Sequence, residues 1–95
     1  MNNSVLIYSE YDDVVAEAVG LLEKSGYIVS SSGALNGAID LITSSDYGYF
    51  LIDDSIDSVT TKYLIAESRR CHPDAPVITF NAVESILTRF RHSRS

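Results

Sequence analysis

The side chains in this sequence that could carry chemistry are acidic and amide groups that closely follow short apolar runs. Glu10, Asp53 and Asn81 each stand one or two positions after such a run. If the runs are neighbouring strands, these side chains meet at one edge of a sheet, where carboxylates repel one another at short range. A hard divalent cation compensates such repulsion, and Mg²⁺ prefers oxygen ligands. The pattern therefore favours a polar site that attracts Mg²⁺.

The elements that must position these groups alternate along the chain. Apolar runs typical of strands buried on both faces occur at residues 5–8, 27–30, 49–52 and 77–80. Apolar residues at helical spacing predict helices over 12–25, after Ser32 as the capping residue, over about 58–71, and from residue 83 onward. Strands separated by helices favour right-handed crossovers and a parallel sheet with helices on both faces. In such sheets, functional groups collect at the carboxyl ends of the strands.

Two single residues mark the connections between these elements. Gly26 stands where a helix often ends in a left-handed backbone conformation. His72 precedes Pro73 in a segment that must be a loop, because proline and the residue before it resist helix formation. We expect the side chain of His72 to be exposed and without a chemical role.

The composition disfavours several functional classes. With 45% hydrophobic residues and two prolines, the 95-residue chain has the composition of one globular domain. It contains no apolar run of membrane-spanning length and no secretory signal pattern. The single cysteine, Cys71, cannot form an internal disulfide, so we expect a cytoplasmic protein. The net charge of −6 disfavours nucleic acid as a partner, although basic residues gather at Arg89, Arg91 and Arg94.

Three stretches of the sequence resemble, in order, the receiver domain of two-component response regulators, over roughly residues 1–85. Residues 5–10 resemble the first strand and the acidic pair that ends it. Residues 47–53 look like the third strand, and residues 75–82 are similar to the fourth. The resemblance implies a flavodoxin-like, doubly wound parallel sheet with helices on both faces.

The resemblance also implies a site and a mechanism. Asp53 takes the phosphoacceptor position, to which a histidine kinase passes a phosphoryl group. Mg²⁺ neutralises the charge on the moving oxygens, with Glu10, Asp53 and Ser55 as its implied ligands. Asn81 takes the switch position, where the family has a hydroxyl that follows the phosphoryl group.

The sequence departs from the receiver pattern at positions that serve phosphotransfer. Ser9 stands in place of one carboxylate of the acidic pair, Asn81 in place of a Thr or Ser, and Asp57 in place of a common proline. The family's fifth strand and its lysine have no counterpart before residue 95, and no lysine follows Lys62. We therefore expect about four strands in a single receiver-like domain over residues 1–95, with 82–95 as a final helix and basic tail, and at most weak Mg²⁺ binding.

The preferred hypothesis is a receiver-like signalling module that is not an enzyme. It acts through protein–protein interaction with a histidine kinase or another signalling protein, and its phosphorylation is degenerate. Compatible with this hypothesis is the interpretation of Asp53 as a solvated loop carboxylate left over from the fold. One alternative is a functional phosphoacceptor that receives phosphate at Asp53. A second alternative is a small transcription regulator with a basic C-terminal tail.

The fourth strand also leads to an expectation about self-association. Without a fifth neighbour it is an edge strand, and an apolar edge is a template for pairing with another chain. We expect a homodimer through the fourth strand and the last helix. Packing of that helix onto its own sheet is the alternative.

Overall fold

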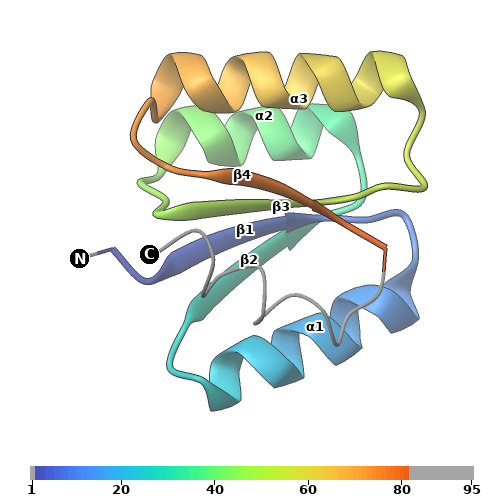
Figure 1. Ribbon diagram of the computed structural model, residues 1–95, viewed down its shortest axis with the longest axis vertical. Helices are drawn as coiled ribbons and strands as arrows, with labels where there is room; N and C mark the ends of the chain where they lie inside the picture. The colour runs from blue at the N-terminus through green and yellow to red at the C-terminus, as the bar shows by residue number, and fades with distance from the viewer. Residues whose placement is uncertain (1, 82–95) are drawn as a thin grey trace.

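The computed structural model describes residues 2–81, which form one parallel sheet between two layers of helices (Figure 1). The elements in chain order are β1 (Ser4–Tyr8), α1 (Asp12–Lys24), β2 (Ile28–Ser32), α2 (Leu35–Ser44), β3 (Tyr49–Asp53), α3 (Ser58–Cys71) and β4 (Val77–Phe80). This is the predicted alternation of strands and helices. The helix predicted from residue 83 and the basic tail lie outside the described residues. None of the helices in residues 2–81 has the length and apolar character needed to cross a membrane.

The sheet has the strand order β2-β1-β3-β4, and all neighbouring strands are parallel. One face is covered by α1, whereas α2 and α3 lie side by side on the other (Figure 1). The chain moves outward from β1 to β2 and then returns past β1 to β3, so the strand order reverses direction between β1 and β3. The carboxyl ends of the strands at such a switch point are where doubly wound sheets place their functional groups.

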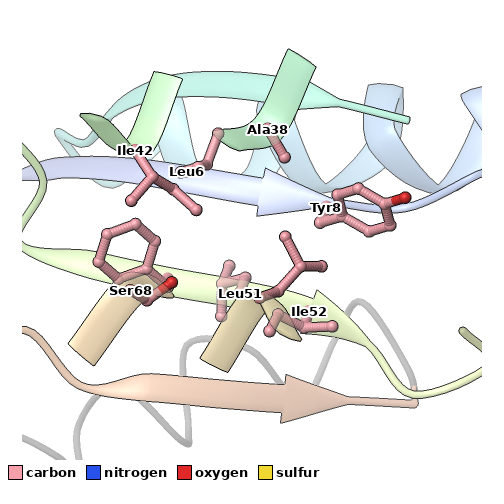
Figure 2. Close-up of a pocket in the computed structure, with 9 residues that line it drawn as sticks. Leu6, Tyr8, Ala38, Ile42, Leu51, Ile52 and Ser68 are labelled. Carbon is pink, nitrogen blue, oxygen red and sulfur yellow. The ribbon is translucent and has the colours of Figure 1, made fainter. Parts of the chain in front are cut away.

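Alternate side chains of the central strands pack into two separate cores. Val5 and Ile7 of β1 face α1, whereas Leu6 and Tyr8 face α2 and α3. Because β1 and β3 are covered on both faces, they read as uninterrupted apolar runs in the sequence. Figure 2 shows side chains that line a small cavity in the core between the sheet and the helices α2 and α3. The cavity, which Ser68 also lines, measures about 10 Å³, which is room for about one water.

The ends of the helices follow from local chemistry, with one correction. Gly26 has a φ of 91° after α1, the left-handed conformation that was predicted for it. Ser32 does not cap α2, contrary to the prediction: it is the last residue of β2, and Ala34 takes the cap position. The hydroxyl of Ser32 instead donates to the carbonyl oxygen of Ala34 at 2.8 Å, so it closes a turn between β2 and α2.

His72 is also placed differently from its prediction. Its side chain is only 11% exposed, and its Nε2 lies 2.8 Å from the carbonyl oxygen of Ile42. The ring packs against the aromatic rings of Tyr47 and Phe50. The loop between α3 and β4 passes over the end of α2, and this tertiary contact covers a side chain that the sequence alone places in solvent.

Candidate functional site

Three loops meet at the carboxyl edge of the sheet, as the sequence predicts. Asp53 is the last residue of β3 and pairs in register with Phe80 of β4. The backbone N–H of Asp54 donates to the carbonyl oxygen of Phe80 at 2.9 Å, which ties the two strand ends together. An open hollow of about 290 Å³ lies at this edge. Its walls are Tyr11, Val14, Glu17, Asp53, Asp54, Ser55, Phe80 and Asn81.

Within residues 2–81, the carboxylate of Asp53 accepts three hydrogen bonds. Its Oδ2 accepts from the hydroxyl of Ser9 at 2.8 Å. Its Oδ1 accepts from both the backbone N–H and the hydroxyl of Ser55, at 3.0 and 2.9 Å. Asp53 is 7% exposed. It is therefore a buried group at the end of a strand, and the interpretation of Asp53 as a solvated loop carboxylate is wrong.

These contacts set the ionisation of Asp53. Burial acts to raise the pKa of its carboxyl group, because a charge is poorly solvated away from water. The hydrogen bonds from the Ser55 N–H, the Ser9 hydroxyl and the Ser55 hydroxyl act in the opposite direction, and together they hold the pKa of Asp53 below its ordinary value of 3.8. Asp53 is thus an ionised carboxylate near neutral pH.

Ser9 is the residue of the site whose contribution sequence reasoning missed, since there it counted only as an absent carboxylate. It is 2% exposed, and its Oγ donates to Asp53 while accepting from the backbone N–H of Tyr11 at 3.2 Å. Its own N–H donates to the carbonyl oxygen of Ser32 at 3.3 Å. Ser9 therefore connects the ends of β1 and β2 to the carboxylate on β3. The signal in the sequence was its position directly after a buried strand.

The structure brings together only part of the predicted site. Asp53, Ser55 and Asn81 line the same hollow, whereas Glu10 is exposed and is not among the lining residues. Glu10 acts on Tyr8 instead. Burial foremost raises the pKa of the Tyr8 phenol, and the negative charges of Glu10 and Asp57 add to that effect. The switch role of Asn81 and the phosphoacceptor role of Asp53 remain predictions.

The oxygen groups gathered at Asp53 do not fit a Mg²⁺ ion well. Within residues 2–81, no three His, Cys, Asp or Glu side chains come together in a way that could hold a metal ion. Among the described residues that line the hollow, Asp53 is the single buried carboxylate, and both of its oxygens accept hydrogen bonds. Mg²⁺ requires a near-octahedral set of oxygen atoms at about 2.0–2.1 Å, with one or two carboxylates usually among them. The ligand set Glu10, Asp53 and Ser55 remains a prediction that this geometry does not favour.

The parallel sheet of residues 2–81, with this strand order and helices on both faces, has a flavodoxin-like fold. The fold class predicted from the sequence is confirmed. Solved structures with this fold include a response regulator and an adenylate cyclase. A response regulator from Burkholderia pseudomallei, with a phosphorylated aspartic acid, a calcium ion and citrate, has a TM-score of 0.75 and 16% identity, and the match covers 95% of this chain and 55% of that one. The adenylate cyclase from Rhodopirellula baltica has a TM-score of 0.74 and 14% identity, over 99% of this chain and 70% of that one.

These likenesses establish the fold and nothing more specific. This chain spans 55% of the response regulator's length. The calcium ion and the phosphorylated aspartic acid are features of that response regulator. By sequence, the chain matches no protein-family model and no curated protein.

Proposed function

We propose that this chain is a receiver-type signalling module that acts by binding other proteins and does not catalyse a reaction. The observation that supports this best is the state of Asp53. Its position at the end of β3 is that of the phosphoacceptor in the fold, yet its carboxylate is buried and bound by Ser9 and Ser55. The module retains the receiver architecture around a carboxylate that accepts hydrogen bonds from Ser9 and Ser55 of the same chain.

Degenerate phosphorylation follows from the groups around Asp53. Phosphoryl transfer depends on positive charge that neutralises the moving oxygens. In residues 2–81, the hollow is lined by three carboxylates and no lysine or arginine. Asn81 replaces the switch hydroxyl, and an amide differs from a hydroxyl in size and reach. We therefore propose that Mg²⁺, if it binds, binds weakly, and that signalling does not depend on a phosphoryl group.

The partners proposed are a histidine kinase or another signalling protein, together with a second copy of this chain. In the sheet formed by residues 2–81, β4 is an outermost strand, and an outer strand can extend a sheet into another chain. The last helix, through which the homodimer was also predicted, lies outside the described residues. We place the module in the cytoplasm, because its one cysteine suits a reducing compartment. The net charge of −6 makes nucleic acid a poor partner.

A phosphorylation assay separates this proposal from its main alternative. The purified chain is incubated with Mg²⁺ and a small acyl phosphate, and separately with phosphorylated histidine kinases of the source organism, and its intact mass is measured. We expect the mass to stay unchanged, and we expect Asp53→Asn to bind a partner kinase as tightly as the unchanged chain does. A phosphoryl adduct that Asp53→Asn abolishes would establish the phosphoacceptor function instead.

Light scattering of the purified chain at tens of micromolar tests the proposed homodimer, and a clean monomer would contradict it.

A further inference from the structure

The relation of Ser9 to Asp53 is fixed by the register of the sheet. Tyr8, the last residue of β1, pairs with Ile52 of β3, so Ser9 directly after β1 and Asp53 at the end of β3 stand at the same level. The 2.8 Å hydrogen bond between their side chains spans the switch point of the sheet. Any side chain at position 9 that points as Ser9 does is a direct neighbour of the Asp53 carboxylate.

The hydroxyl of Ser9 is fully used in this position. It has one proton, which it donates to Oδ2 of Asp53, and it accepts from the N–H of Tyr11. A cation bound to Oδ2 would have to use the second lone pair of that oxygen and would compete with the Ser9 proton for its negative charge. On the other oxygen, Ser55 contributes two donors. Three neutral donors thus stabilise the charge of Asp53 where a cation would otherwise do so.

We propose that Ser9 and Ser55 replace a divalent cation at this site, so that the module holds its Asp53 carboxylate in place without metal, and that Ser9→Asp alone turns the hollow into a divalent-cation site. The proposal deepens the proposed function, since it specifies how a receiver-type module works independently of Mg²⁺. A carboxylate at position 9 would stand directly beside that of Asp53. The two negative charges would repel each other until a cation bound between them.

The test is a metal titration of the purified chain after removal of metal with a chelator. Mg²⁺ binding is measured by calorimetry, and the melting temperature is followed with Mg²⁺ against NaCl of equal ionic strength. For the unchanged chain we expect no saturable heat up to millimolar Mg²⁺ and the same melting temperature in both salts. For Ser9→Asp we expect saturable binding at least tenfold tighter than that of the unchanged chain, and a melting temperature that rises with Mg²⁺.

Matched variants separate charge from shape. Ser9→Asn has nearly the size of Ser9→Asp without the charge, so it should gain no affinity for Mg²⁺. Adding Asp53→Asn to Ser9→Asp should remove the gained affinity. Mg²⁺ binding by the unchanged chain that Asp53→Asn abolishes would overturn the proposal, and so would a folded Ser9→Asp variant that gains no affinity. If Ser9→Asp does not fold, the titration of the unchanged chain still tests whether Asp53 is held in place without a divalent cation. Binding of a signalling partner is measured in a separate experiment. If that experiment contradicts the proposed function, the result of the Mg²⁺ titration is unaffected.

Discussion

The imidazole of His72 joins the end of α3 to the last turn of α2, with its Nε2 2.8 Å from the carbonyl oxygen of Ile42. That carbonyl is one of the last four of α2, which have no N–H partner within the helix. On the other side of the ring, Nδ1 lies 3.4 Å from a carboxylate oxygen of Asp46. His72 therefore holds two adjacent helices together at the end of the sheet opposite the Asp53 site.

Replacement of His72 by alanine should destabilise the fold. The change removes the hydrogen bond to Ile42 and the packing of the ring against Phe50, whose centroid lies 5.4 Å away. Together these losses should lower the free energy of unfolding by roughly 1–3 kcal/mol, measured by urea denaturation. Asp46→Asn is the control, since the Asp46 side chain is 86% exposed. It should change the stability by less than about 0.5 kcal/mol, and equal losses in the two variants would contradict this account of His72.

Ser9 and Asp53 should be energetically coupled. Ser9→Ala removes a hydrogen bond to a buried charge, which should cost about 1.5–3 kcal/mol of unfolding free energy. In a double-mutant cycle with Asp53→Ala, the effect of Ser9→Ala should largely disappear, because its partner is already absent. Additive losses would mean that Ser9 acts mainly through its bond to Tyr11. The measurement is urea denaturation of the four proteins in the cycle at pH 7.

Two positions on α3 should differ sharply in their tolerance of alanine. Leu64 is 2% exposed in the core between α3 and the sheet, whereas Val59 is 77% exposed on the same helix. Leu64→Ala should cost about 2–5 kcal/mol, because it removes buried apolar surface and leaves a cavity. Val59→Ala should stay within about 0.5 kcal/mol of the unchanged chain. Thermal and urea unfolding of both variants test this, and a large loss at Val59 would indicate that this surface is covered.

Asp57 should make the stability of α3 depend on pH. Its side chain caps the helix by accepting from the N–H of Thr60 at 2.9 Å, and the hydrogen bonds from Thr60 hold the pKa of Asp57 below its ordinary value of 3.8. Because the folded-state pKa is lowered, the contribution is fully present above the unfolded-state pKa and is lost as the pH falls through the folded-state value.

The Asp57→Asn variant isolates this contribution, since asparagine also caps helices but carries no charge. When the pH falls from 7 to 3, the unfolding free energy of the unchanged chain should drop more than that of Asp57→Asn. Parallel profiles of the two proteins in urea denaturation would show that the charge of Asp57 is not involved.

The bounds of most helices and strands in residues 2–81 were predicted well from local patterns, and β2 is the main exception. The third helix and the fourth strand have their predicted bounds, because α3 lies between a capping aspartate and a proline loop. The second strand was placed at 27–30 but extends over Ile28–Ser32. Its serines have weak strand propensity, and they become strand residues because they pair with β1 through Tyr8↔Ser32. That pairing is a long-range contact and leaves no local signal.

The sequence by itself determined that strands and helices alternate and that Asp53 ends a strand buried on both faces, because hydrophobic periodicity and strand-end polarity are local properties of the chain. Only the tertiary structure decided what touches Asp53. The sequence pattern predicted that Glu10 lies beside Asp53, yet Ser9 is buried against the carboxylate and Glu10 is exposed. The register between β1 and β3 causes this difference, because it places Ser9 beside Asp53, which is 44 positions away in the sequence.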